Sequence, residues 1–237
     1  MLVKTKAIVI STLKYQEKSL IVKCFTQSDG LKTYFVRDAF SNKKTSQKNA
    51  YFQPLNLLEI VAIHKNKNTL ETLKEIKINT PLHAIHTNIF KSTVVLFLSE
   101  MLQNAIHEEE KNEPLFVYLE TALLWLDHNT QTANFHLITL LDITKYLGFY
   151  PNINQIQKPF FELIEGTFSN HQAISALNET QTKLFKKLIA LKLSDTQNHF
   201  HSHDRQTLLK IIIDYYALHL NGFKRPKSID ILKEIFQ

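Results

Sequence analysis

Residues 3–37 read VKTKAIVISTLKYQEKSLIVKCFTQSDGLKTYFVR and decide the fold. Short runs of β-branched and aromatic residues alternate here with turn formers such as Ser28-Asp29-Gly30, which is the pattern of β-strands joined by tight turns. In the third run, successive side chains point to opposite faces of a strand. One face carries Lys32, Tyr34 and Val36, and the other carries Thr33, Phe35 and Arg37.

Five strands are predicted in the first third of the chain. They cover residues 7–12, 20–26, 32–37, 55–63 and 69–78, with a polar, positive loop between the third and the fourth. Five strands in about 75 residues suit a small closed barrel of the OB type, whose face and loops commonly bind oligonucleotides. An SH3-like barrel fits the pattern nearly as well, since this is a likeness at the level of the fold.

After Pro81 the apolar residues recur with the period of a helix instead of a strand. Helices are expected from about Ile89 to Leu102, over 113–128, 134–147, 178–192 and 204–220, and from Ser228. The segment 160–168 predicts a β-hairpin. The expected architecture is therefore α+β and multidomain, with an OB-fold β-barrel over residues 1–80 and an α-helical domain over 81–237 that contains a small β-hairpin insertion at about 152–170.

Positive charge is concentrated in the predicted barrel. Residues 1–80 hold 14 Lys and Arg against 6 Asp and Glu, whereas residues 81–237 hold 14 against 16. A localised positive field favours a polyanion, because each neutralised phosphate releases condensed counterions. Nucleic acid is the leading class of partner, and a lysine-rich surface that only aids solubility is the alternative.

Aromatic residues are interleaved with these cations, which is the combination that single-stranded nucleic acid needs. The candidate DNA-binding residues are Lys4, Lys6, Lys14, Lys18, Lys23, Lys32, Tyr34, Arg37, Lys43, Lys44 and Lys48. Packing in the core competes with base stacking, more strongly for Phe35 than for Tyr34. For the lysines of the 43–48 loop the alternative is a solvated loop.

No motif of a common enzyme is present. The GxSxG turn, the GxxxxGK[ST] phosphate loop and the HExxH zinc helix are absent. His199, His201 and His203 form an HxHxH run without an evident fourth ligand, so a solvated loop is favoured over a metal site. We therefore expect no catalytic residue, no metal and no cofactor.

Cys24 is the only cysteine, so it has no partner in the chain for a disulfide, and a reducing cytoplasm fits best. The N-terminus lacks the apolar core of a signal peptide, and no run of about 18 apolar residues is present. A cytoplasmic protein without a membrane partner is expected.

Residues 205–228 predict an amphipathic helix that ends at Gly222 and is followed by a basic cluster. Cations near a helix C-terminus interact favourably with its dipole, which is a sufficient structural reason for them. Partner docking is the sharper alternative, because an apolar groove rimmed by cations suits an acidic peptide that ends in an aromatic residue and a free carboxylate. The candidate partner-binding residues are Lys210, Lys224, Arg225 and Lys227.

Four segments, in this order, resemble the RecO family of bacterial recombination mediators. They are residues 3–37, FQPLNLLEI at 52–60, FHLITLLDITKYLGFYPN at 135–152 and LLKIIIDYYALHLNGFKRPKS at 208–228. The likeness spans nearly the whole chain. The forms QPL at 53–55 and LGFYPN at 147–152 are similar to those of Bacteroidetes members.

The resemblance implies a non-enzymatic DNA repair and recombination protein of the RecF pathway, cytoplasmic and associated with the nucleoid. Its OB-fold binds single- and double-stranded DNA. Such proteins anneal complementary strands and, with RecR, help load RecA onto DNA coated by single-strand DNA-binding protein, whose acidic C-terminal tail is a further partner. Arg37 matches the basic position that ends the family's third strand, and Lys43 and Lys44 match the basic loop after it. An adaptor that binds acidic peptide tails without touching DNA is the alternative.

Two departures from the family pattern matter. Some members carry a four-cysteine zinc site after the LGxxPN segment, but residues 153–170 here contain no cysteine. We expect apolar contacts of Phe160, Phe161 and Phe168 to hold the hairpin instead. Asp38 stands where the family usually has a glycine, and its carboxylate beside Arg37 is expected to neutralise part of that charge.

Overall fold

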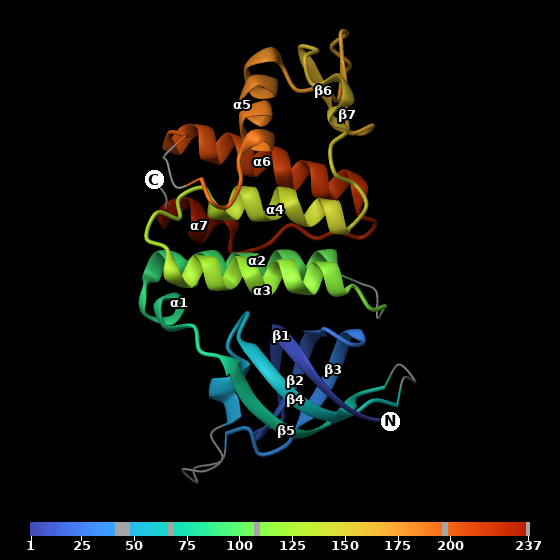
Figure 1. Ribbon diagram of the computed structural model, residues 1–237, viewed down its shortest axis with the longest axis vertical. Coiled ribbons are helices and arrows are strands. Elements are labelled where there is room, and N and C mark those ends of the chain that lie inside the picture. Colours follow the sequence, from blue (N-terminus) through green and yellow to red (C-terminus); the bar gives the residue numbers. More distant parts are fainter. Residues whose placement is uncertain (41–47, 66–68, 107–109, 196–198, 236–237) are drawn as a thin grey trace. The chain divides into compact units, whose positions relative to one another are not determined.

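The computed structural model describes residues 1–40, 48–65, 69–106, 110–195 and 199–235 (Figure 1). Contacts divide the chain into two compact units, Met1–His128 and Asn129–Gln237, and each is described by itself. Within the described residues, no helix is both long and apolar enough to cross a bilayer.

The first unit contains a closed barrel of five strands in its described part. The strands are β1 (Leu2–Tyr15), β2 (Ser19–Thr26), β3 (Gly30–Val36), β4 (Leu57–Ile63) and β5 (Glu71–Thr80). Their order around the barrel is β1-β2-β3-β5-β4. All neighbours are antiparallel except β3 and β5, which pair in parallel at two positions only, Tyr34 with Glu71 and Phe35 with Thr72. The predicted five-stranded barrel is confirmed.

The barrel interior is filled by one face of each strand, as the period of two requires. Along β3 every second residue is buried, from Gly30 to Val36. Further core residues come from β1, β2 and β4: Ala7, Val9, Leu20, Val22, Cys24, Leu58, Ile60 and Ala62. A β-bulge between Val9 and Ser11 interrupts the alternation along β1, which affects the faces of all the residues after it.

The described part of the first unit also contains α1 (His83–Thr87), α2 (Ile89–Ala105) and α3 (Glu113–His128), of which α2 and α3 pack against the barrel. Ser99 of α2 donates to the carbonyl of Ile10 at 2.6 Å. The rings of Phe25 and Phe116, the latter on α3, lie 6.0 Å apart. The helices therefore cover part of the outer face of the barrel. The sequence-based division of the chain at residue 80 coincides with the end of β5 and stays a prediction about domains.

The second unit is helical, with α4 (Phe135–Tyr146), α5 (Glu179–Ala190), α6 (Ser202–His219) and α7 (Ile229–Ile235). A small antiparallel sheet of β6 (Phe160–Glu162) and β7 (Thr167–Ser169) accompanies them. Asn178 caps α5 through a reciprocal pair of hydrogen bonds with Gln181, which satisfies donors at the helix start. The predicted helical part with a β-hairpin is confirmed.

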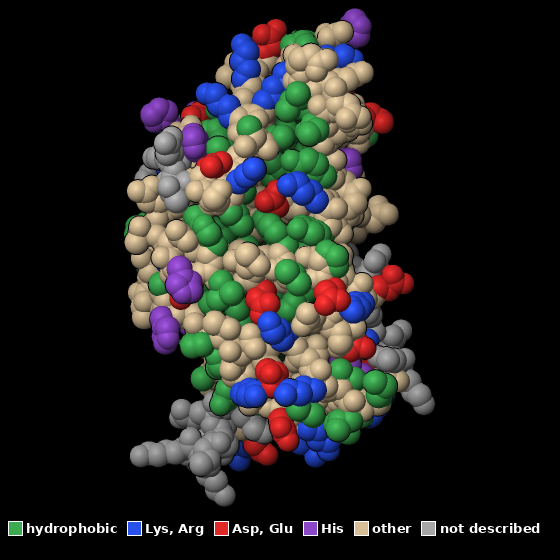
Figure 2. Space-filling view, in the orientation of Figure 1, with side chains coloured by type: hydrophobic (Ala, Val, Ile, Leu, Met, Phe, Trp, Pro, Cys, Tyr) green, Lys and Arg blue, Asp and Glu red, His purple; other side chains and the backbone are tan. Residues whose placement is uncertain are grey.

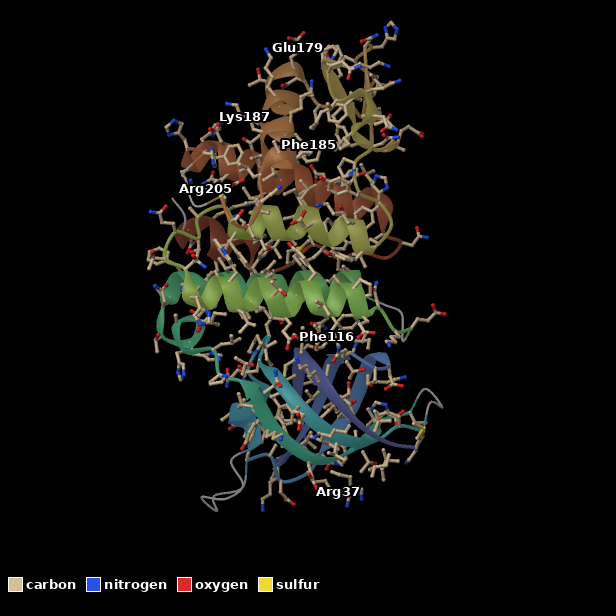
Figure 3. All side chains as sticks on the ribbon, viewed as in Figure 1. Arg37, Phe116, Glu179, Phe185, Lys187 and Arg205 are labelled. Carbon is tan, nitrogen blue, oxygen red and sulfur yellow. The ribbon has the colours of Figure 1, made fainter. Side chains whose placement is uncertain are left out.

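An aromatic cluster holds the hairpin. Phe161 lies 4.9 Å from Phe168 and 4.8 Å from Phe185 of α5 between ring centroids, and 5.8 Å from Tyr215 of α6. All four rings are buried, and Figure 3 labels Phe185 on α5. The prediction is confirmed for Phe161 and Phe168, whereas Phe160 is only half-buried. The sequence did not indicate the contributions of Phe185 and Tyr215.

Candidate nucleic-acid interface

An apolar row crosses the outer face of strands β1, β2 and β3. Leu13 lies opposite Ile21, and Ile21 lies opposite Phe35, so the three side chains share one face of the sheet. Tyr15 follows Leu13 by two residues and shares that face. Leu13 is 63% exposed and Tyr15 is 44% exposed. We call Leu13, Tyr15, Ile21 and Phe35 the outer row.

The aromatic members of the outer row contact each other edge to face. The ring centroids of Tyr15 and Phe35 are 5.9 Å apart and the planes cross at 82°, a geometry that the ring quadrupoles favour. The guanidinium carbon of Arg37 lies 5.8 Å from the Phe35 centroid, within the range of a cation–π contact. Aromatic faces and a fixed positive charge therefore meet at the end of β3.

Further cations lie on the outer face and at the neighbouring β1–β2 turn. Lys23 lies opposite Ser11 and Thr33 on the same face of the sheet, and Lys14 and Lys18 are exposed at the β1–β2 turn. Lys14 stands over the Phe40 ring at 5.5 Å. Within the described residues, Lys14, Lys18, Lys23 and Arg37 form no ion pair, so their charge remains available to an anion.

A groove opens where β3 and β5 separate beyond their two paired positions. Its volume is about 500 Å³. Its lining includes the apolar Phe35 and Leu70, the cations Arg37 and Lys74, and the carboxylates of Asp38 and Glu71. Phe35 thus belongs both to the outer row and to the groove wall. Figure 3 shows Arg37 at the end of the barrel remote from Phe116, so this region lies away from the helices that cover the barrel.

Another side of the barrel carries lysines that are already paired. Glu59 on β4 lies 3.3 Å from the Nζ of Lys4 and 2.8 Å from that of Lys77, and the hydrogen bond from Lys77 lowers the pKa of Glu59. Lys6 binds Glu120 of α3 at 2.9 Å. Figure 2 shows basic and acidic side chains side by side over the barrel. These lysines add little net positive field.

Two family models together match almost the whole chain. "Recombination protein O N terminal" matches residues 1–82, and "Recombination protein O C terminal" matches residues 86–229. The chain belongs to the RecO family. Curated relatives named "DNA repair protein RecO" are 65% identical in Flavobacterium psychrophilum, over 237 residues, and in Flavobacterium johnsoniae, over 236. The relative in Bacteroides fragilis is 37% identical over 242 residues, and all three alignments cover 100% of both chains. The resemblance to Bacteroidetes members is confirmed.

The zinc site of some RecO-family members does not fit this chain. Residues 153–170 contain no cysteine, and the hairpin interior is occupied by Phe161 and Phe168. Among the described residues, no three His, Cys, Asp or Glu side chains gather as metal ligands would. The predicted loop around the HxHxH run is wrong in part, because His201 precedes α6 directly and His203 lies in its first turn.

The prediction that Tyr34 stacks on bases is wrong for this RecO-family chain. Tyr34 is 1% exposed, and its Oη lies 2.8 Å from Nε2 of His64. Burial raises the pKa of Tyr34, so the phenol stays a hydrogen-bond donor. Lys32 is buried on the same inward face, so its predicted contact with phosphate is also wrong. The two faces of β3 were predicted correctly, but the inward face is the one that carries Tyr34.

The other predicted DNA-binding residues divide into three groups. Lys23 and Arg37 share the face of the outer row, with Lys14 and Lys18 at the neighbouring β1–β2 turn, whereas Lys4 pairs with Glu59 of β4 and Lys6 with Glu120 of α3. Lys43 and Lys44 lie outside the described residues. Lys48 begins a 3-10 helix, Lys48–Phe52, and its side chain is also outside the description. Leu13 and Tyr15 were missed because the predicted first strand stopped at residue 12. The alternation in the sequence would in any case have placed both with Ala7 and Val9 on the inward face, because it does not reveal the bulge between Val9 and Ser11.

Asp38 sits beside Arg37 without forming an ion pair with it in the described structure. Its φ is +53°, a left-handed conformation that favours glycine and that Asp tolerates better than most residues. The glycine that the resemblance to the family implies here would adopt this conformation without strain. The carboxylate of Asp38 lines the groove and reduces the positive field there.

The predicted partner-binding residues lie at and beyond the end of α6. Lys210, Lys224 and Lys227 are exposed. Arg225 instead binds Asp214 of α6, with 2.5 Å between Nη2 and Oδ1. Leu218 is 51% exposed and follows Asp214 and Lys210 at intervals of four residues, so the three share one face of the helix. An apolar side chain flanked by cations is the arrangement that peptide docking needs.

Proposed function

We propose that the chain is a non-enzymatic DNA-binding mediator of recombinational repair, which holds single- and double-stranded DNA on the β1–β3 side of its barrel. The observation that supports this most is the difference between two sets of cations. Lys23 and Arg37 share the face of the outer row, and Lys14 and Lys18 lie at the neighbouring β1–β2 turn, all four without carboxylate partners in the described structure. Lys4 and Lys77 instead share Glu59, so the first set offers more charge that a phosphate chain can neutralise.

The finer steps of the proposal follow from membership of the RecO family. The protein anneals complementary strands in the RecF pathway. With RecR it helps load RecA onto DNA coated by single-strand DNA-binding protein, in the cytoplasm and near the nucleoid. A barrel that holds the backbone without reading base edges suits these steps, because annealing and loading must proceed on any sequence.

Fluorescence anisotropy with labelled DNA at several salt concentrations tests the proposal. Replacing Lys14, Lys18 and Arg37 together by Gln removes three phosphate contacts. The slope of log K against log salt should then become shallower by about 2 on single strands, at about 0.7 for each contact. The matched control replaces Lys4, Lys6 and Lys77 by Gln and changes the net charge equally, but it should leave the slope within about 0.5 of the unaltered value. Equal effects of the two triple variants would place the DNA elsewhere.

A second candidate function is an adaptor that binds acidic peptide tails through the second unit. The exposed Leu218 lies on the same helix face as Lys210, two turns away, and Lys224 and Lys227 are exposed beyond the helix, which favours this role. A pull-down with a peptide that has an acidic C-terminal tail tests this role. Replacing Lys210, Lys224 and Lys227 by Glu should abolish capture and leave DNA binding unchanged, because these lysines belong to the other unit. Capture that survives the replacement would exclude this surface.

A further inference from the structure

We infer that the outer row is a stacking platform for unpaired bases, so that the barrel binds single-stranded DNA in preference to duplex. The inference rests on the proposed function, which supplies the phosphate contacts. It adds a second kind of contact, between aromatic faces and bases, and it assigns this contact to Leu13, Tyr15, Ile21 and Phe35.

The bulge in β1 is what places Leu13 and Tyr15 on the same face as Ile21 and Phe35. Before it, Ala7 and Val9 point into the barrel core. After it, Thr12 lies opposite the buried Val22, while Leu13 lies opposite Ile21 on the outer face. With an uninterrupted alternation, the odd-numbered positions would stay on the inward side, and Leu13 and Tyr15 would lie on the face away from Ile21 and Phe35. A bulge re-aims side chains in this way, and here it adds two large apolar ones to the outer face.

Most of the remaining barrel exterior is covered or charged, with the exposed Leu2 as an exception. Where β1 and β2 are apolar on the outside before the bulge, helices cover them, as at Ile10 and Phe25. Where the exterior is open on β4 and β5, it carries paired charges such as Glu59 and Lys77. Single exposed apolar residues need no explanation, but adjacent ones that share a face mark a binding surface.

The cations around the row indicate the chemistry of the occupant. Arg37 lies over Phe35, and Lys23 shares the outer face of the sheet. An apolar protein surface would gain nothing from these charges. A single strand of nucleic acid matches both features, because its phosphates meet the cations while its bases stack on the rings.

The groove between β3 and β5 extends the platform. Phe35 and Leu70 line it with apolar surface, and the lining cations Arg37 and Lys74 could bind a phosphate. Its volume of about 500 Å³ is in the range of about 300 to 1,000 Å³ that holds small organic ligands. The groove is therefore large enough to hold a base next to Phe35, where the outer row ends.

The preference for single strands follows from the geometry of DNA. In a duplex each base face is covered by the neighbouring bases, and only the phosphates and groove edges are open. Aromatic side chains therefore contact bases only where these are unpaired. The cations can therefore bind the phosphates of single-stranded and double-stranded DNA, whereas the outer row can bind only the bases of single strands.

Anisotropy with three probes of equal length tests the inference: an oligo-dT strand, a strand of abasic residues, and a duplex. The unaltered protein should bind oligo-dT more tightly than the abasic strand, since the two differ only in their bases. Tyr15→Ala should weaken binding of oligo-dT by about fivefold to 150-fold, the loss expected for one stacked base. It should leave the abasic strand, the duplex and the salt slope unchanged.

Two further variants serve as controls. Tyr15→Phe keeps the ring and should keep the affinity for oligo-dT. Val117→Ala removes an exposed apolar side chain from α3, 47% exposed, and should change no affinity. Should Tyr15→Ala fail to fold, Leu13→Ala replaces it, with a smaller loss that is again confined to oligo-dT.

The outcomes separate this inference from the proposed function. Equal affinity of the unaltered protein for oligo-dT and the abasic strand overturns the platform and leaves the proposed function standing. A loss by Tyr15→Ala that is the same on all three probes overturns it as well, because the ring then supports the barrel and not a base. Absence of binding to every probe overturns the proposed function and the platform together.

Discussion

Tyr34 donates a hydrogen bond of 2.8 Å to Nε2 of His64 inside the barrel, and Nδ1 of the same ring lies 3.1 Å from Oδ2 of Asp29. The contacts join the β2–β3 turn, β3 and the end of β4. An imidazole that donates from Nδ1 to the carboxylate can accept at Nε2 from the phenol, so both nitrogens are satisfied by one neutral tautomer. This chain of hydrogen bonds is structural, and DNA has no access to it.

Tyr34→Phe should therefore destabilise the protein without affecting the DNA site. The ring still fits, but His64 loses its donor while it remains buried, which costs about 1 to 3 kcal/mol. Urea unfolding measures the loss, and anisotropy at a temperature where both proteins are folded should give equal DNA affinities. Tyr15→Phe is the matched control, since an exposed hydroxyl contributes within about 0.5 kcal/mol. A drop in DNA affinity for Tyr34→Phe alone would contradict the assignment.

The period of two in the sequence separated the faces of β3 correctly, yet it did not say which face would be inside. Each face carries one aromatic residue, one cation and one further residue, so hydrophobicity does not decide. The closure of the barrel decides, because Val36, Tyr34 and Lys32 lie opposite Leu20, Val22 and Cys24, which face the core. The alternation within one strand cannot predict which strands pair with each other, and therefore cannot predict which face is inside.

The sequence also could not predict which lysines form ion pairs with carboxylates. Lys6 meets Glu120 across 114 positions of the chain, and Lys4 shares Glu59 with Lys77 through strand register. The first third of the chain does contain more Lys and Arg than Asp and Glu. Which lysines keep their charge available depends on contacts that exist only in the folded barrel.

The free energy of unfolding should decrease below about pH 6.5 because of His136. Burial, with a further contribution from Arg205, lowers the pKa of this histidine from 6.5 to about 3. A depressed histidine pKa means that the unfolded chain binds the proton more readily, so stability is complete above pH 6.5 and is lost progressively toward pH 3. From these values the loss at pH 5 is about 2 kcal/mol. Urea unfolding at pH 7.5 and pH 5 measures it.

His136→Gln isolates this contribution. The variant is less stable at pH 7.5, but the difference between its free energies of unfolding at the two pH values should be smaller than in the unaltered protein by about 2 kcal/mol. The carboxylates whose pKa values are lowered, such as Glu162, act in the same direction only at lower pH and are present in both proteins. An unchanged pH dependence would mean that His136 becomes protonated in the folded state.

Gly166 should be far less tolerant of alanine than Gly148. Both have positive φ, +64° and +86°, so both substitutions strain the backbone by about 1 kcal/mol. At Gly166 the added Cβ would also lie 2.6 Å from Oη of Tyr215, whereas nothing lies within 4 Å at Gly148. Tyr215 would have to give up its hydrogen bond of 2.8 Å to the carbonyl of Phe149. Gly166→Ala should therefore lower stability by about 1 to 3 kcal/mol more than Gly148→Ala, as read by thermal unfolding. Equal losses would show that the Tyr215 contact is dispensable.

A fragment of residues 1–128 should fold, whereas a fragment of residues 1–80 should not reach the same state. The barrel's outer face depends on α2 and α3, through Ser99 on the carbonyl of Ile10 and through Phe116 against Phe25. Removing the helices exposes Ile8, Ile10 and Phe25, which are buried in the unit. Exposing three large apolar side chains costs about 1.5 to 3 kcal/mol each, comparable to the whole stability of a small domain.

Circular dichroism and urea unfolding of the two fragments decide the matter, because a cooperative transition is the mark of an independently folded unit. Fragment 1–128 should unfold cooperatively and retain the DNA affinity of the full chain, since the outer row and its cations are complete within it. Phe116→Ala in this fragment should lower its stability by about 3 to 5 kcal/mol. Val117→Ala, one residue away on the exposed face of α3, should change it by less than about 0.5 kcal/mol. If fragment 1–80 unfolds cooperatively with full DNA affinity, the helices are an appendage, and the barrel alone is the DNA-binding unit.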